Sequence, residues 1–545
     1  MSTKRPLYVY DNWSAYDEMS DNVPLTEELA MFQFEQVCRL RRLGVKFDAY
    51  LMDAFWYAPD GGYLEWRRDR WPHGPERWLE ACEREGILPG LWFTANTAFH
   101  LEPPAAWRDS LAADGWGYSC SKGGFLDGFM AVLAHWYARG IRVFKFDFAD
   151  FNASPAGMAA SDAGEVRRGN VAAFRGALRA FREGHPEAEL LAYNGFEHTE
   201  YMTWSDRPVR PVLDRAWLEV FDTVYCGDPR PADLPLASLW RSCDVYADAM
   251  VHLLHRGSGL GLREIDNCGF MIGRCGTCYR RGAEAWRTTA LLSYARGGRV
   301  HVAMGNLEAL TDEDARWLAR VQGLYEAAGE PEWVGGNPGA GELYAYAAGG
   351  LLTVVNPGLE PRELVAGEEF RLACLDGLGE LREGALRLGP GAVAVLARGS
   401  DAPDLGVGEG PRLSLAPMAV EWRRIEGGLE GVVPAPPEGD LHVGFTQRDA
   451  EGMAIRTSGG APPDGVRSAA LLRILATQDG REVPIRRQDD RPIWSGMSWA
   501  YGVIEGSTVR AGGPIHVRFE SSEPKAAEFE GFALLGTPTI NRRRR

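Results

Sequence analysis

Short apolar runs alternate with longer amphipathic stretches throughout the first 330 residues of the chain. Apolar positions spaced three and four apart predict helices, as in Thr26–Leu43, which opens on a capping threonine and stops at a glycine, and in Ala163–Glu183. The short runs between them predict eight β-strands: Leu7–Asn12, Phe47–Asp53, Leu88–Phe93, Ile141–Asp147, Leu190–Asn194, Thr223–Asp228, Arg263–Asn267 and Arg299–Met304. Eight strand–helix units in about 330 residues predict an α/β fold, the (β/α)8 TIM barrel.

The pattern changes after the last predicted barrel helix, which begins at Thr311 and ends near Gly329. Beyond it, short alternating runs separated by Gly and Pro turns predict β-structure, for example at Leu343–Ala347, Leu351–Asn356 and Ala392–Ala397. We therefore expect three domains: the barrel in residues 1–330, a β-sandwich in 331–400, and a second sandwich-like domain in 401–545 that ends in a frayed basic tail.

The composition narrows the class of protein. The chain of 545 residues is 45% hydrophobic and 25% charged, which is typical of globular proteins. Its net charge of −16 repels phosphate backbones and anionic lipids. No apolar run approaches the length of a membrane span, and the N-terminus lacks the apolar segment of a signal peptide. We expect a soluble, cytoplasmic protein that binds neither nucleic acid nor membranes; these features set no oligomeric state.

Nine cysteines make an odd number in a long chain, so reduced thiols are expected. The group Cys268, Cys275 and Cys278 lacks the second pair of a typical zinc site. Buried or loop thiols are the preferred interpretation over a metal site, and no metal or cofactor is expected.

Carboxylates end four of the predicted barrel strands, among aromatic residues: Asp53, Asp147, Asp228 and Asp266. Catalytic groups of (β/α)8 barrels lie at this end of the strands. Acids that bind hydroxyl groups and aromatic faces that cover C–H groups are typical of a sugar site, although Asp is also a common turn residue. Asn194 ends the fifth strand and is a further candidate for substrate binding or capping, and Asp11-Asn12-Trp13 at the end of the first strand is a weaker one.

The motifs around these acids resemble the α-galactosidases of glycoside hydrolase families 27 and 36. Phe144-Lys145-Phe146-Asp147 is similar to their Lys-Trp-Asp or Lys-Tyr-Asp, and Asp53 with Trp56 resembles their Asp-Asp-Gly-Trp element. Leu91-Trp92-Phe93 is similar to their third strand, and Tyr225-Cys226-Gly227-Asp228 to the Trp-Thr-(Ser/Gly)-Asp of families 36 and 31. Ile265–Phe270 resembles the Ala-Asp-Ile-Cys-Gly-Phe segment of the family 31 α-glucosidases.

The resemblance implies a retaining α-glycosidase that hydrolyses a terminal α-linked sugar through a covalent glycosyl-aspartate. It implies Asp147 as the nucleophile and Asp228 as the acid/base. The expected substrate-binding residues are Asp53, Trp56, Trp92, Lys145, Asn194 and Asp266. Packing in the barrel core is an equally good interpretation of each tryptophan. The expected partner is a small oligosaccharide or glycoside.

Three departures from the family pattern bear on specificity. The second Asp of the strand-2 element is Ala54 and its Gly is Phe55, so one carboxylate that holds the sugar in α-galactosidases is missing. The third strand continues as Thr94-Ala95-Asn96 where family 36 has Glu-Pro-Glu. Galactose specificity is therefore open, and an α-glycosidase or transglycosidase of another specificity remains an alternative.

Asp244 is an alternative acid/base, because Trp240-Arg241-Ser242-Cys243-Asp244 is similar to the Trp-Arg-x-x-x-Asp of family 27. Making these residues a strand would give the barrel nine strands, so a helix is predicted there and Asp228 is preferred. An alternative from another class is a carbohydrate-binding protein on a degenerate barrel without catalysis.

Overall fold

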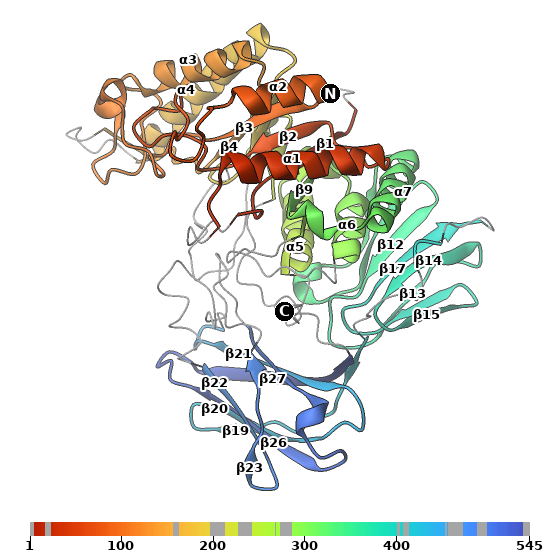
Figure 1. Ribbon diagram of the computed structural model, residues 1–545. Coiled ribbons are helices and arrows are strands. Elements are labelled where there is room, and N and C mark those ends of the chain that lie inside the picture. The colour runs from red at the N-terminus through yellow and green to blue at the C-terminus, as the bar shows by residue number, and fades with distance from the viewer. Residues whose placement is uncertain are drawn as a thin grey trace.

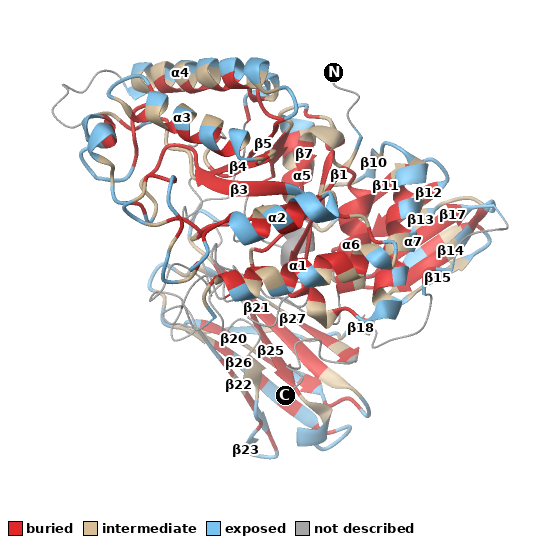
Figure 2. Ribbon diagram, turned by 45° about the horizontal axis from the view of Figure 1, so that its top comes forward, coloured by how far each residue is buried: buried red, intermediate tan, exposed pale blue. Residues whose placement is uncertain are grey.

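The structure is a computed structural model that describes residues 5–16, 23–155, 163–196, 213–226, 242–267, 269–272, 286–399, 404–406, 414–452, 455, 472–487 and 499–537. Figure 1 shows a helix-covered parallel sheet in the first 330 residues of the chain, followed by antiparallel strands, of which β12 (Leu351–Val355) and β17 (Val393–Arg398) lie next to the last barrel helices. The buried residues concentrate on the parallel strands and on the inner faces of their helices (Figure 2).

A parallel sheet of nine hydrogen-bonded segments, counted over the described residues, builds the N-terminal half. Its order is β7-β6-β5-β4-β3-β2-β1-β9-β8. The segments are β1 (Leu7–Asp11), β2 (Ala49–Met52), β3 (Leu88–Thr94), β4 (Val143–Asp147), β5 (Glu189–Ala192), β6 (Thr223–Tyr225), β7 (Ile265–Asp266), β8 (Phe270–Ile272) and β9 (Val300–Gly305). The helices are α1 (Glu27–Arg42), α2 (Glu76–Glu85), α3 (Phe125–Ala138), α4 (Ala163–Gly184), α5 (Ser242–Gly257), α6 (Trp286–Ala295) and α7 (Asp312–Ala328). Each of the eight predicted strands is found, and the α/β barrel class is confirmed.

The seventh predicted strand is split, and this split explains nine segments in an eight-stranded barrel. β7 pairs with β6, whereas β8, which three residues separate from β7, pairs with β9 at the other end of the sheet. The backbone N–H of Arg299, just before β9, donates to the carbonyl of Arg263 at 3.0 Å. The chain between Arg263 and Ile272 therefore joins the two ends of the sheet and closes the barrel.

Helix ends follow the sequence signals. The hydroxyl of Thr26 accepts a hydrogen bond from the N–H of Leu29 at 3.2 Å, and this caps α1. Thr311 and Asp314 form a capping box before α7, which ends at Gly329, so both predicted boundaries are confirmed. Across the part of the chain that the structure describes, no helix has the length and hydropathy needed to cross a bilayer.

Antiparallel sheets follow α7. One contains β10 (Glu332–Gly335), β11 (Tyr344–Ala348), β12 (Leu351–Val355), β17 (Val393–Arg398) and β14 (Phe370–Asp376), and a smaller one contains β13 (Arg362–Val365), β16 (Ala385–Leu388) and β15 (Gly379–Arg382). A buried carboxylate joins the larger sheet to the barrel. Asp248 of α5 lies 2.6 Å from Arg296 Nε, and it also accepts a hydrogen bond from the hydroxyl of Tyr346 in β11 at 2.7 Å. This arrangement fixes the sheet against α5.

Two further sheets face each other near the C-terminus. They comprise β18 (Ser414–Pro417), β27 (Glu528–Thr537), β21 (Asp440–Arg448), β25 (Trp499–Ile504) and β24 (Arg486–Arg487), and β19 (Arg423–Ile425), β20 (Gly428–Pro434), β26 (Pro514–Ser521), β22 (Leu472–Gln478) and β23 (Arg481–Glu482). Phe445 of the first sheet stacks on Phe519 of the second at 4.6 Å between ring centroids. The two sheets thus share a core, as the alternating pattern predicts for a sandwich.

The barrel closure makes Gly269 a sensitive position. It has a φ of 59°, and a Cβ there would overlap the backbone carbonyl of Val302 in β9. We expect Gly269→Ala to lower the free energy of unfolding by more than about 3 kcal/mol, since strain from the φ angle and overlap with backbone add together. Urea unfolding followed by tryptophan fluorescence measures this, because 14 of the 18 tryptophans lie in residues 1–330.

Gly86 offers a matched control. Its φ of 62° is nearly the same, but a Cβ there meets no atom within 4 Å. Gly86→Ala should therefore show only the backbone contribution, about 1 kcal/mol. Equal losses in the two variants would contradict the role given to the Gly269 contact.

Candidate active site

The alternation of strand β4 places two charged side chains inside the barrel. Phe144 and Phe146 pack outward against α4, with ring centroids 5.6 Å from Phe181 and 6.3 Å from Phe174. Lys145 and Asp147 therefore face the interior, since successive side chains of a strand point to opposite faces. Asp147 lies at the carboxyl end of the strand and is 7% exposed.

Four N–H donors hold the Asp147 carboxylate. Its Oδ1 accepts hydrogen bonds from the backbone N–H groups of Phe148 at 2.9 Å and Asn194 at 3.1 Å, and from the Asn194 side-chain amide at 3.1 Å. Its Oδ2 accepts one from the Trp92 indole at 3.2 Å. Donors aimed at both oxygens stabilise the ionised form of a carboxylate and fix its orientation. Trp92 and Asn194, both expected to bind substrate, thus position Asp147.

The Lys145 ammonium bridges two other carboxylates. Its Nζ lies 2.7 Å from an oxygen of Asp53, which follows β2, and 2.9 Å from an oxygen of Asp11, at the end of β1. All three side chains are buried, and the ammonium also lies 4.1 Å from the centre of the Tyr193 ring. Lys145, expected to bind substrate, thus pairs with Asp11 and Asp53 and interacts with Asp147 through charge.

Burial and charge set the ionisation of this group of three. Burial, and then the negative charge of Asp53, raise the pKa of Asp11 to about 8, against the lowering influence of Lys145. For Lys145, burial opposes the charged form, but the charges of Asp11, Asp53 and Asp147 outweigh it and raise its pKa. A charged lysine faces two carboxyl groups of which Asp11 holds a proton through neutral pH.

Asp266, at the end of β7, lies on the other side of the barrel interior. It is fully buried, and its Oδ2 accepts a hydrogen bond from the Tyr193 hydroxyl at 2.9 Å. The Tyr193 ring stacks on Tyr225 with 4.5 Å between centroids. Sequence reasoning missed Tyr193, which links Lys145 to Asp266. The period-two pattern that placed Lys145 inside also places Tyr193 inside, and this was the available signal.

Trp56 is fully buried, and its indole donates to the backbone carbonyl of Trp92 at 3.0 Å. It packs among three other tryptophans, with ring centroids 4.9 Å from Trp66 and 5.5 Å from Trp136, while Trp66 lies 4.6 Å from Trp71. Of the two interpretations given for this residue, the structure places it in the packing one. The cluster is a rigid base under the loop after β2.

The acid/base candidates differ in what the structure describes of them. Asp228 lies outside the described residues, as do Cys268, Cys275 and Cys278. Asp244 belongs to helix α5, as predicted, and does not end a barrel strand. No group of His, Cys, Asp and Glu side chains within the described ranges has the arrangement of a metal site.

Known proteins are similar to this chain in structure rather than in sequence. No family model and no curated protein matches the chain. Similar solved structures include the GH36 α-galactosidase AgaA from Geobacillus stearothermophilus, at 11% identity and a TM-score of 0.46, covering 98% of this chain and 56% of that one. The galactosidase domain of the α-galactosidase–sucrose kinase AgaSK aligns at 11% identity, with a TM-score of 0.47 and coverages of 98% and 55%. A single-residue mutant of the trehalulose synthase MutB aligns at 13% identity, with a TM-score of 0.44 and coverages of 72% and 98%.

The chain spans slightly more than half the length of the two α-galactosidases with which it aligns.

The raised pKa of Asp11 predicts a pH dependence of stability. In the unfolded chain Asp11 releases its proton near pH 3.8, whereas in the folded barrel it holds it to about 8. The folded state therefore binds more protons in this window, and the contribution of Asp11 to the free energy of unfolding falls as the pH rises through it, by at most about 1.4 kcal/mol per unit. Asp11→Asn lacks this contribution, so the stability of the parent should fall relative to that of the variant from pH 5 to pH 8.

Urea midpoints at pH 5, 6, 7 and 8 test this. Asp312→Asn, at an exposed position in the first turn of α7, is the control and should give a profile parallel to that of the parent. A parallel profile for Asp11→Asn as well would contradict the assignment of a raised pKa to Asp11.

Proposed function

We propose that the protein is a retaining α-glycosidase with Asp147 as its nucleophile. The observation that supports this most directly is the buried Asp147 carboxylate, oriented by four N–H donors at the carboxyl end of β4. A carboxylate that attacks carbon must be ionised and fixed in direction. The donors around Asp147 fix the direction of the carboxylate and favour its ionised form.

The first step forms a glycosyl-enzyme. An oxygen of Asp147 attacks the anomeric carbon, the bond from that carbon to the leaving oxygen breaks, and a carboxylic acid on the opposite face of the sugar gives its proton to the leaving oxygen. We assign that acid to Asp228 and keep Asp244 as the alternative, since both follow β6 in the chain.

The second step releases the sugar. The acid, now ionised, takes a proton from water, and the water oxygen attacks the anomeric carbon as the bond to Asp147 breaks. Two inversions leave the configuration unchanged. Both carboxylates return to their initial states, so the cycle needs no cofactor.

The group of Lys145, Asp11 and Asp53 would hold the sugar hydroxyls. A hydroxyl can accept from an ammonium while it donates to a carboxylate, and this cluster offers both. Ala54 replaces the second acid of the resembling motif, so fewer carboxylates are available here than in α-galactosidases. We therefore propose α-galactosides as one class of substrate among compounds that carry a terminal α-linked sugar. The substrate would be an oligosaccharide or a simple glycoside.

Substitution of the nucleophile tests the function. The parent protein should hydrolyse one member of a panel of nitrophenyl α-glycosides, and Asp147→Asn should lower kcat/KM by at least about 10³-fold, because the amide cannot form the intermediate. Asp48→Asn is the same substitution just before β2, at the opposite end of the barrel, and should stay within about threefold of the parent. Sugar binding without hydrolysis in the parent would instead indicate a binding protein.

Azide distinguishes the nucleophile from the acid/base. In Asp147→Gly, azide should displace the leaving group directly and give the β-glycosyl azide. In an acid/base variant, azide should attack the covalent intermediate and give the α-glycosyl azide. We expect the α-product from Asp228→Gly and not from Asp244→Gly, and the anomeric coupling in the proton NMR spectrum identifies each product. The reverse result for the last two variants would transfer the acid/base role to Asp244.

A further inference from the structure

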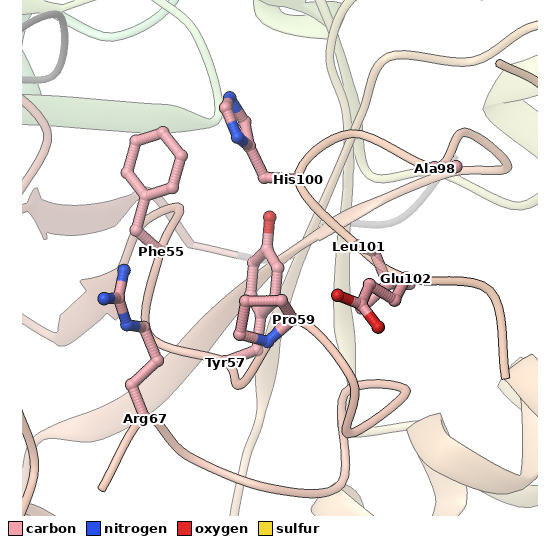
Figure 3. Close-up of a pocket in the computed structure, with 8 residues that line it drawn as sticks. All are labelled: Phe55, Tyr57, Pro59, Arg67, Ala98, His100, Leu101 and Glu102. Carbon is pink, nitrogen blue, oxygen red and sulfur yellow. The ribbon is translucent and has the colours of Figure 1, made fainter. Parts of the chain in front are cut away.

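A cavity of 390 Å³ lies between the loops that follow β2 and β3, and Tyr57 in its lining stacks on Trp92, the indole that donates to Asp147. The lining of the cavity includes Phe55, Tyr57, Arg67, His100 and Glu102. Figure 3 shows Phe55 and Arg67 on one side and Glu102 on the other, with Tyr57 and Pro59 between them. Its volume is in the range of small-molecule sites, and aromatic faces next to an arginine and a carboxylate are groups that bind sugar rings and hydroxyls.

Aromatic rings connect the cavity with Asp147. Trp92, which donates to Asp147, lies 6.1 Å from Phe99, and Phe99 lies 6.0 Å from Phe55 between ring centroids. Phe148, the residue after Asp147, lies 4.7 Å from Phe99. These packed rings connect the wall of the cavity with the carboxylate, so the cavity and Asp147 belong to one aromatic cluster at the carboxyl end of the barrel strands.

The backbone around the cavity is strained. Phe55, His100 and Phe148 have φ angles of 78°, 49° and 49°, a region that residues with side chains rarely adopt. The motif that the chain resembles has Gly where Phe55 stands, and a glycine would relieve the strain at that position. Strain of this kind gathers at functional sites and persists when the surroundings fix it. Here the Tyr57 hydroxyl donates to the carbonyl of Phe99 at 3.1 Å and joins the two loops.

The position of the cavity fixes which end of a sugar it would receive. Under the proposed function, the anomeric carbon lies between Asp147 after β4 and an acid that follows β6. The opposite end of the ring then points toward β1, β2 and β3, where Asp11 and Asp53 lie with the Lys145 ammonium between them. Phe55 is two residues beyond Asp53, so the cavity lies past the hydroxyl-binding group, away from the leaving group.

We infer that this cavity is a subsite for a second sugar residue, attached to the non-reducing side of the residue whose bond is cleaved. The inference rests on the proposed function for its direction. Phe55 covers one face of the second ring, and Arg67 and Glu102 bind its hydroxyls. With this subsite filled, the residue whose bond is cleaved is no longer the terminal one, so the inference extends the proposed function from the release of a terminal sugar to the release of a terminal disaccharide. Phe55, which stands where the resembling motif has a glycine, favours this longer donor.

Product analysis is the first test. A nitrophenyl α-disaccharide of the sugar that the panel identifies should yield nitrophenol and the intact disaccharide. In Phe55→Gly, the ratio of kcat/KM for this substrate to that for the nitrophenyl monosaccharide should fall at least tenfold, and in Glu102→Ala it should fall in the same direction. Glu383→Gly also relieves a left-handed φ, of 49°, but lies between β15 and β16, and it should leave the ratio unchanged. Release of the terminal monosaccharide first, or an unchanged ratio in Phe55→Gly, would overturn the inference while leaving the proposed function intact.

Binding to Asp147→Asn provides a readout that needs no turnover. Isothermal titration would compare methyl α-glucoside with methyl α-maltoside, and methyl α-galactoside with methyl α-galactobioside. In one pair the disaccharide should bind at least tenfold more tightly, and Phe55→Gly in the same background should reduce this preference below threefold. If the disaccharide binds more tightly and this preference depends on Phe55, the subsite is supported. If the parent protein also hydrolyses none of the glycosides, only the proposed function is overturned. No preference that depends on Phe55 in either pair overturns the subsite.

Discussion

The Lys145 ammonium, buried between the carboxyl groups of Asp11 and Asp53, sets the conditions for the barrel interior. A buried cation is unfavourable unless opposite charge and polar groups lie within contact distance; here the negative charge of Asp53 lies at 2.7 Å and a carboxyl oxygen of Asp11 at 2.9 Å. The three residues come from the middle of β4, from the end of β1 and from just after β2. Each therefore depends on the barrel register, and the register in turn places Thr94 of β3 opposite Asp147 of β4.

The pairing of Lys145 with Asp11 and Asp53 divides the site into two electrostatic parts. In the first part, these two carboxyl groups stabilise the charge of the Lys145 ammonium, which also lies over the face of the Tyr193 ring. The other part holds Asp147 with neutral N–H donors from Trp92, Phe148 and Asn194. Lys145 lies in contact with Asp11 and Asp53, whereas these N–H donors fix the direction of the Asp147 oxygens.

The loops beyond the strands add specificity to this fixed centre. Trp56, Trp66, Trp71 and Trp136 pack beneath the loop after β2, so Phe55 and Tyr57 project from a rigid base. The sheet that contains β11 is held to the barrel by a second buried group, in which Asp248 pairs with Arg296 and accepts a hydrogen bond from Tyr346. Both features stabilise the fold. The groups that we propose for catalysis and substrate binding remain at the carboxyl ends of the strands.

The sequence determined the local elements and the positions of the acids along them. Period-two and helical patterns reflect which face of an element is buried, a local property, and they predicted the eight strands and the caps at Thr26 and Thr311. Asp53, Asp147 and Asp266 do lie at strand ends, which follows from chain order alone.

Only the tertiary structure decided which of these residues meet. Lys145 pairs with residues 134 and 92 positions away, and nothing in the spacing distinguishes Asp11 and Asp53 from Asp147 as its partners. The burial of Trp56, the split of the seventh strand at Gly269 and the cavity beside Phe55 likewise depend on contacts between distant segments. Such contacts arise from packing in three dimensions, and a one-dimensional pattern records which residues are buried but not which ones they are buried against.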